Sequence, residues 1–172
     1  MKINNNIIKE DRLFFIAEAG VNFYDIAKKE HISNVAAAKL MVKEAALAGA
    51  DAIKFQIYKA EKLASKYSPS YWDTTKEKIT SQYELFKKFD TLTNENWEDI
   101  ARYAKENNII FMATPFDQEA VILVDKLSLI FKVASADITN FPMLKLIAKK
   151  GKPIILSTGA STKKEIMEAI HV

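Results

Sequence analysis

The sequence contains no cysteine, and only four of its 172 residues are glycine. The absence of thiols excludes disulfides, thiolate metal sites and cysteine nucleophiles. The first residues lack the apolar run of a signal peptide, and no stretch approaches the roughly 20 apolar residues of a membrane span. We therefore expect a cytoplasmic protein without a membrane partner. Its 49% hydrophobic, 10% aromatic and 27% charged residues are typical of a folded domain and argue against disorder.

Arginine is also scarce, because only Arg12 and Arg102 are present. The 25 Lys and Arg exceed the 22 Asp and Glu by three, which gives a net charge of +3. Proteins that bind nucleic acid gather basic residues into patches and rely on arginine forks. Here the lysines are scattered among acidic residues, as in Lys39, Lys43 and Glu44. We read them as a solvated surface and expect no nucleic-acid partner.

Long apolar runs are missing, but five short ones rich in Ile, Val and Phe recur along the chain. Such near-continuous apolar runs predict strands buried on both faces, as in a parallel sheet. The five predicted strands are residues 13–17, 52–57, 109–113, 130–134 and 153–156.

Helical patterns with recognisable caps lie between these strands. The predicted N-cap residues of these helices are Ser33, Asp117, Asn140 (followed by Pro142) and Thr162 (with Glu165 in a capping box). Alternating strands and helices predict right-handed βαβ units, in either an eight-stranded barrel or a doubly wound open sheet. No Gly-x-Gly-x-x-Gly turn or Walker loop follows a strand, which favours the barrel. We predict an α/β fold, a partial TIM (β/α)8 barrel of about five parallel β/α units, forming one domain over 1–172 with an N-terminal extension at 1–12.

One connection is unusually long, since about 50 residues separate the second and third predicted strands. Helical spacing over 81–89 and 93–108 accounts for part of it. The remainder, 58–80, holds Tyr67, Tyr71 and Trp72. This segment either forms a lid over the mouth of the barrel or covers a helix of the outer ring.

Polar side chains interrupt the apolar runs. Lys54 and Gln56 are two residues apart and therefore share one face of their strand. Lys132 interrupts another strand, and Glu18 follows the first. Burying a charged residue in a sheet costs several kcal/mol, in order of magnitude, unless it is paired or solvated. A structural interpretation pairs Lys54 or Lys132 with Glu18 inside the barrel.

A functional interpretation is more economical, because these residues cluster toward the carboxyl ends of the strands, where barrel active sites lie. Three hydroxyl residues, Thr114, Ser135 and Ser157, follow strands at the same end. Two lysines and these hydroxyls together suit a ligand carrying phosphate and carboxylate groups.

Two carboxylates accompany this group. Glu18 and Asp137 are available for proton transfer or for binding sugar hydroxyls. His31 and His171 have no ligand spacing with each other, so we assign no metal site within the chain.

Five motifs resemble, in order, those of the sialic acid synthase (N-acetylneuraminate synthase-like) family. They are Phe15-Ile-Ala-Glu-Ala-Gly-Val-Asn22, Ala50-Asp-Ala-Ile-Lys-Phe-Gln56, Ala113-Thr-Pro-Phe-Asp117, Lys132-Val-Ala-Ser135 and Ile155-Leu-Ser-Thr-Gly159. The resemblance implies a TIM-barrel synthase that condenses phosphoenolpyruvate with an open-chain N-acylated aldose, such as N-acetylmannosamine, and releases phosphate.

The resemblance also assigns roles. It implies that phosphoenolpyruvate is held by Lys54, Thr114, Lys132, Ser135 and Ser157. It implies that Gln56 and Asp137 contact the sugar and that Glu18 acts as an acid/base or water-orienting carboxylate.

This chain departs from the family in three places. Asn22-Phe23-Tyr24-Asp25 stands where many members have an Asn-His-x-Gly type loop, and Asp137 stands where they have a glutamate. Members continue through three more barrel strands, with two histidine ligands for a divalent metal (Mn or Mg), and into a small antifreeze-like domain. We expect those parts, and the metal ligands, to lie outside this chain.

Other functions remain open. One is a catalytically incomplete barrel fragment that binds anions or assembles with a complementing chain or a second copy, because five strands leave two open edges. Another is a related phosphoenolpyruvate-aldose synthase that makes an eight- or seven-carbon sugar acid, or an aldolase on the same fold. A complete barrel needs about 250 residues, so 172 residues are three strand-helix units too few.

Overall fold

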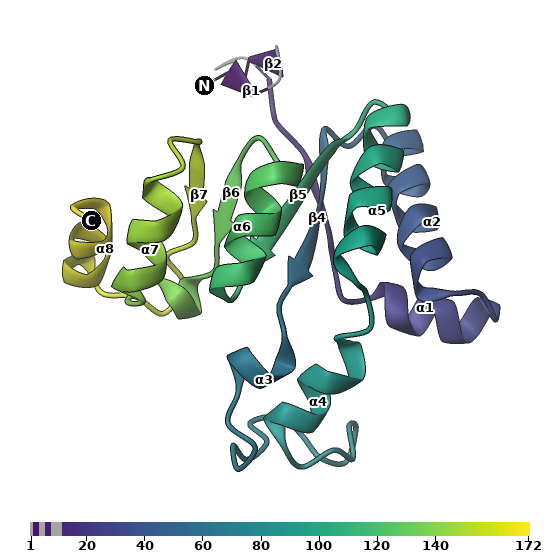
Figure 1. Cartoon of the computed structure of the whole chain (residues 1–172), viewed down its shortest axis with the longest axis horizontal. Helices are drawn as coiled ribbons and strands as arrows, with labels where there is room; N and C mark the ends of the chain where they lie inside the picture. Colours follow the sequence, from purple (N-terminus) through teal and green to yellow (C-terminus); the bar gives the residue numbers. More distant parts are fainter. Residues whose placement is uncertain (1, 4–5, 8–11) are drawn as a thin grey trace.

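A computed structural model describes residues 2–3, 6–7 and 12–172. The chain alternates strands and helices (Figure 1). The elements are β1 (Lys2–Ile3), β2 (Asn6–Ile7), β3 (Ile16–Gly20), α1 (Phe23–Glu30), α2 (Asn34–Leu47), β4 (Ala52–Ile57), α3 (Ala60–Leu63), α4 (Gln82–Phe89), α5 (Asn94–Glu106), β5 (Ile110–Pro115), α6 (Gln118–Leu127), β6 (Phe131–Val133), the 3-10 turn η1 (Ser135–Asp137), α7 (Phe141–Ala148), β7 (Ile154–Leu156) and α8 (Lys163–Ile170).

The strands from β3 onward run parallel and lie in chain order. β3, β4 and β5 form one hydrogen-bonded sheet, and β6 pairs with β7. β5 and β6 are neighbours bridged by Ser128, whose hydroxyl lies 3.0 Å from the Phe111 carbonyl and 2.8 Å from the Ile130 carbonyl. The α/β fold with parallel strands is confirmed.

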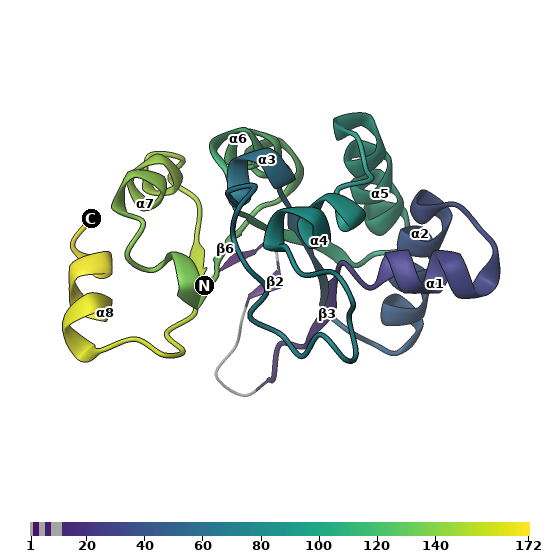
Figure 2. The same cartoon turned by 90° about the horizontal axis from the view of Figure 1, so that it is seen from below.

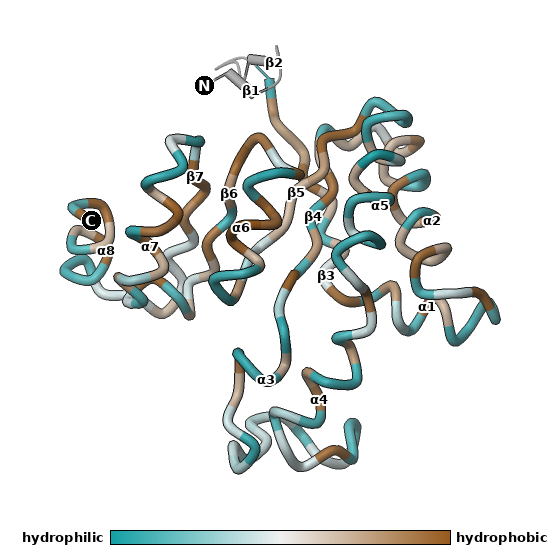
Figure 3. The backbone as a smooth tube through the Cα atoms, viewed as in Figure 1, coloured by the Kyte–Doolittle hydropathy of each residue, from teal (hydrophilic) through white to brown (hydrophobic). Residues whose placement is uncertain are grey.

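The helices cover one side of these strands. Seen from below, α8, α7, α6, α5 and α2 form an arc, and the strands lie on its concave side (Figure 2). On the face toward the helices, the outer face, Phe55 lies 5.8 Å from Phe111 and 5.6 Å from Trp97 between ring centroids. Brown, apolar stretches concentrate on the strands and adjoining helices (Figure 3). The main core therefore lies between strands and helices.

The opposite, inner face of the strands has two layers. Its apolar floor lies toward the amino ends of the strands and centres on the fully buried side chains of Ala52, Met112 and Ile130. Two residues further along β4 and β6 come Lys54 and Lys132. On β4 and β6 these lysines thus lie on the carboxyl side of Ala52 and Ile130, whereas Met112 on β5 is level with Lys54.

The first predicted strand was misplaced by three residues, because β3 spans Ile16–Gly20 instead of 13–17. Leu13 and Phe15 point into solvent, with 75% and 60% of their surface exposed. Phe15 is held through its backbone, since its N–H donates to the Asp51 carboxylate at 2.9 Å. Glu18 consequently lies inside the strand and does not follow it.

The predicted helix starts are confirmed. Ser33, Asp117, Asn140 and Thr162 each accept a backbone N–H of their own first turn, and Glu165 completes the capping box at Thr162. Two helices were missed, the short α3 and α1, which begins at Phe23. Asn22 makes no side-chain cap there. Phe23 instead anchors the helix by packing edge-on against Trp97, with centroids 6.0 Å apart.

The long connection contains α3 and α4, which project beyond the carboxyl end of β4 (Figure 1). This segment is largely pale or teal in Figure 3, so it is more hydrophilic than the strands. Tyr67 and Tyr71 are exposed, at 94% and 76%. Its role as a lid remains a prediction. Of the extension predicted over 1–12, the structure describes β1 paired antiparallel with β2, and residues 1, 4–5 and 8–11 lie outside the described residues.

The edge of β3 faces an apolar groove. Within the described residues, β3 pairs with β4 alone. The groove beside it has a volume of about 530 Å³ and is lined by residues of β3, α1 and α2, among them Ala17, Ile26, Leu40 and Met41. In the described part of the chain, no helix combines the length and apolar character needed to cross a bilayer.

Candidate active site at the carboxyl ends of the strands

Lys54 and Glu18 form an ion pair on the inner face. They are direct neighbours in the register of β3 and β4, and the Lys54 ammonium contacts Glu18 Oε2. The Lys54 side chain is 9% exposed, whereas that of Glu18 is 57% exposed. The structural interpretation of these charges is therefore correct for this pair, although the pair also lies at the predicted site.

Lys132 has neutral partners instead. Its Nζ donates to Ser157 Oγ at 2.6 Å and to the Val133 carbonyl at 2.8 Å. Burial, and then the positive charge of Lys54, lower the pKa of Lys132, and the charge of Glu18 opposes this effect. The two ammonium groups are thus close enough to repel each other, and an anion placed between them would relieve that repulsion.

Gln56 and Thr114 lie on the inner face, closer to the carboxyl ends of the strands. They are register partners on β4 and β5, and Thr114 is buried inside β5, not after it. Gly20, at the end of β3, has a positive φ of 55°. A Cβ there would lie 3.7 Å from Gln56 Nε2 and 3.8 Å from Glu18 Oε1, so Gly20 brings these two side chains to one place. Sequence reasoning overlooked Gly20, although a glycine at a strand end is a signal of close approach.

Ser135 and Ser157 come from neighbouring units. Ser157 contacts Lys132, and Ser135 Oγ lies 3.5 Å from the position of a Cβ on Gly159, within the same turn as Ser157. We call Lys54, Thr114, Lys132, Ser135 and Ser157 the anion cup. The structure brings Lys132 and Ser157 into direct contact, places Thr114 and Ser135 at the carboxyl ends of β5 and β6, and places Lys54 in the middle of β4.

Asp137, at the end of η1, is half-buried. Its Oδ2 is buried and has no hydrogen-bond partner within the described residues. Burial raises the pKa of Asp137, against a hydrogen bond from Asn140 that lowers it. An orphaned carboxylate oxygen of this kind has an open place for a donor such as a sugar hydroxyl.

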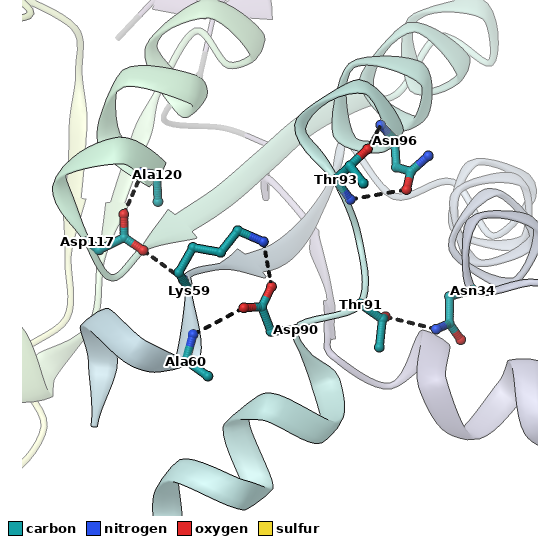
Figure 4. Close-up of polar contacts among 9 residues, drawn as sticks. All are labelled: Asn34, Lys59, Ala60, Asp90, Thr91, Thr93, Asn96, Asp117 and Ala120. Atoms are coloured by element: carbon teal, nitrogen blue, oxygen red, sulfur yellow. Dashed lines mark hydrogen bonds and ion pairs between the residues drawn. The ribbon is translucent and has the colours of Figure 1, made fainter. Parts of the chain in front are cut away.

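A second set of carboxylates holds the chain where β4 ends (Figure 4). Asp117 accepts the backbone N–H groups of Lys59 and Ala120, each at 2.8 Å. Asp90 accepts the Lys59 ammonium at 2.7 Å and the Ala60 N–H at 3.1 Å. These contacts fix the exit of β4 against α6 and α4, and therefore the end of the strand that bears Lys54 and Gln56.

The described residues do not fit a metal ion. Over 2–3, 6–7 and 12–172, no three His, Asp or Glu side chains gather into a possible ligand set. His31 and His171 each cap the carboxyl end of a helix, α1 and α8. The orphaned Asp137 supplies one carboxylate donor, whereas a protein-held catalytic metal typically uses about three ligands.

Comparison with known proteins identifies the chain's relatives. It is 41% identical to N,N'-diacetyllegionaminic acid synthase of Campylobacter jejuni over 94% of this chain and 46% of that protein. It is 32% identical to human N-acetylneuraminate-9-phosphate synthase over 92% of this chain and 42% of that one.

A solved structure is similar as well. The N-acetylneuraminic acid (sialic acid) synthetase of Leptospira borgpetersenii, in complex with citrate, superposes with a TM-score of 0.75 at 28% identity, covering 96% of this chain and 53% of that one. The chain thus spans about half the length of the relatives it matches. The NeuB family model matches residues 41–172, and the chain belongs to the NeuB family.

Proposed function

We propose that this chain is the phosphoenolpyruvate-binding part of a nonulosonic (sialic-type) acid synthase. The observation that carries the proposal is the convergence of Lys54 and Lys132 on the inner face, with Ser157 in contact with Lys132. The relatives named above are sugar acid synthases, and one is solved with citrate, a multiply charged anion. The fold we propose is a partial (β/α)8 barrel of about five units.

Binding of phosphoenolpyruvate would follow from charge. Lys132 is held by two neutral oxygens, so its positive charge remains available to the ligand. Thr114, Ser135 and Ser157 add hydroxyl donors, and hydrogen bonds to an ionised group are about twice as strong as neutral ones. Partial burial of the lysines strengthens their attraction for an anion, because the effective dielectric constant is lower than in water.

The reaction would start when the enol carbon of phosphoenolpyruvate attacks the aldehyde carbon of the open-chain sugar, and the aldehyde oxygen takes up a proton from water to become a hydroxyl. Water then adds at the former enol C2, and the tetrahedral intermediate loses phosphate to give the 2-keto acid. Glu18, next to the lysine pair and mostly exposed, would orient the water and take its proton. Lys54 and Lys132 would stabilise the negative charge on the departing phosphate.

The acceptor would be an N-acylated aldose such as N-acetylmannosamine. Gln56 lies near the carboxyl end of β4, and its amide and the Glu18 carboxylate both approach Gly20. Asp137 offers its orphaned oxygen to a hydroxyl group of the sugar. A divalent metal would be held by ligands outside the described residues, and none of the roles given to Glu18, Lys54 and Lys132 depends on it.

The second candidate is a fragment that binds anions without turnover. The edge of β3 has no partner strand among residues 2–3, 6–7 and 12–172, and it lies beside an apolar groove. Both features favour this candidate, because an open edge and an exposed apolar surface can bind a complementing chain or a second copy. We place either form in the cytoplasm.

The deciding experiment measures phosphate release. The chain is incubated with phosphoenolpyruvate, N-acetylmannosamine and Mn2+, alone and with a chain carrying the remaining barrel strands. Release that needs both substrates supports the synthase. Phosphate release by the chain alone would rule out the hypothesis of an inactive fragment. An absence of release in both mixtures would contradict the synthase hypothesis. Erythrose 4-phosphate or arabinose 5-phosphate in place of N-acetylmannosamine tests the related seven- and eight-carbon synthases.

A further inference from the structure

The two lysines of the anion cup differ in the charge of their partners. Lys54 contacts the carboxylate of Glu18, whereas Lys132 contacts a hydroxyl and a carbonyl oxygen. A buried ammonium without an opposite charge costs several kcal/mol, in order of magnitude. Lys54 is nearly buried and therefore needs a counter-ion whenever the cup is empty.

Glu18 can leave that position more easily than Lys54 can. The Glu18 side chain is 57% exposed, so its carboxylate can rotate into water without a large desolvation cost. Gly20 leaves space beside it, since even an added Cβ would stay 3.8 Å from Glu18 Oε1. Lys54, at 9% exposure, has no comparable freedom.

An incoming anion would meet Glu18 at close range. Two negative groups that share one ammonium repel each other, and the mobile one moves away. We infer that Glu18 is a displaceable counter-ion, which neutralises Lys54 in the empty cup and is released from it when an anion binds. This inference rests on the proposed anion cup. It adds that Glu18, a side chain of the protein itself, competes with the ligand for the Lys54 ammonium.

Removal of this competitor should tighten anion binding. We expect Glu18→Gln to bind inorganic phosphate and phosphoenolpyruvate about three- to tenfold more tightly than the parent. This range corresponds to the usual strength of an ion pair that is partly exposed and partly buried. Glu18→Asp, which keeps the charge, should stay within about twofold of the parent.

The matched control is Glu119→Gln. Glu119 pairs with Lys62 in a more exposed ion pair, so this variant changes the net charge equally without touching the cup. It should change phosphate affinity by less than about 1.5-fold. Affinities are measured by calorimetry at constant ionic strength on full chains whose folding is verified by circular dichroism.

Several results would overturn the inference. Glu18→Gln could bind phosphate no more tightly than the parent, or both glutamine variants could gain equally, which would indicate an effect of net charge alone. Binding of phosphate by neither parent nor Glu18→Gln would overturn the inference together with the anion cup. Tighter binding by Glu18→Gln, together with an absence of condensation activity in the parent chain even with a complementing chain, would support the counter-ion and contradict the synthase.

Discussion

The Asp117 carboxylate accepts the backbone N–H of Lys59 at 2.8 Å, across 58 residues of sequence. The same carboxylate caps α6 through the Ala120 N–H. One buried side chain therefore joins the end of β4 to the start of the helix that follows β5. This contact ties two neighbouring strand-helix units together at the edge of the proposed site.

Asp117→Ala should lower the free energy of unfolding by about 1–3 kcal/mol, because it leaves two backbone N–H groups without their acceptor. Asp117→Asn, which keeps one acceptor oxygen, should have a smaller effect. The control is Asp73→Ala, since the Asp73 carboxylate accepts from Thr75, two residues away, and joins no distant segments of the described chain. Urea unfolding measures all three. Equal effects of Asp117→Ala and Asp73→Ala would contradict the bridging role.

Lys54→Ala and Lys132→Ala should each weaken phosphoenolpyruvate binding by roughly ten- to a hundredfold, the usual value of a hydrogen bond to a charged group. The losses should shrink as salt rises, because ions screen the attraction. Lys62→Ala removes a lysine outside the cup and should have little effect. Calorimetric titrations at two salt concentrations provide the test, and parental affinity in both cup variants would make these lysines structural.

Anion binding should decline with rising pH earlier than an ordinary lysine would allow, since burial and Lys54 lower the pKa of Lys132. Only the protonated ammonium attracts the anion, so binding is strong below that pKa and weakens above it. Glu18→Gln should move the decline to still lower pH, because Glu18 raises this pKa. Phosphate affinity measured from pH 7 to 10 shows where binding declines. A decline at the same pH in the parent and in Glu18→Gln would contradict its assignment to Lys132.

Asp137→Asn should stabilise the protein at neutral pH. Burial raises the pKa of Asp137 in the folded state above its unfolded value, so the folded state binds the proton more tightly. The resulting stability is present at low pH and is lost as pH rises through the folded pKa. We expect a melting temperature about 1–3 °C higher at pH 7 for Asp137→Asn. The difference should vanish near pH 3, and a gain independent of pH would point to another cause.

The helices were largely predictable because their starts are local. Ser33, Asp117 and Thr162 each cap a turn that begins one residue later, so spacing alone reveals them. α1 lacks such a signal and is held by Phe23, which packs against Trp97. That contact joins distant parts of the chain, and no local pattern could show it.

The site was predictable in its residue types and only partly in its contacts. The interruption of apolar strands by Lys54, Gln56 and Lys132 indicated in advance that Lys54 and Gln56 share one face of their strand. The pairing of β4 with β5 places these two residues beside Met112 and Thr114. Which lysine would pair with Glu18 depended on the register of β3 against β4, and the position of β3 was wrong by three residues. Contacts across strands require that register, which is a tertiary property.

Met112 in the apolar floor is the register partner of Lys54 and lies on β5, the strand between the two lysines. Because its side chain is apolar and fully buried, it keeps the local dielectric constant low on this part of the inner face. A smaller side chain that admitted a water molecule would raise the local dielectric constant and weaken the repulsion between the lysines. The electrostatics of this face can thus be adjusted by changing a residue that carries no charge.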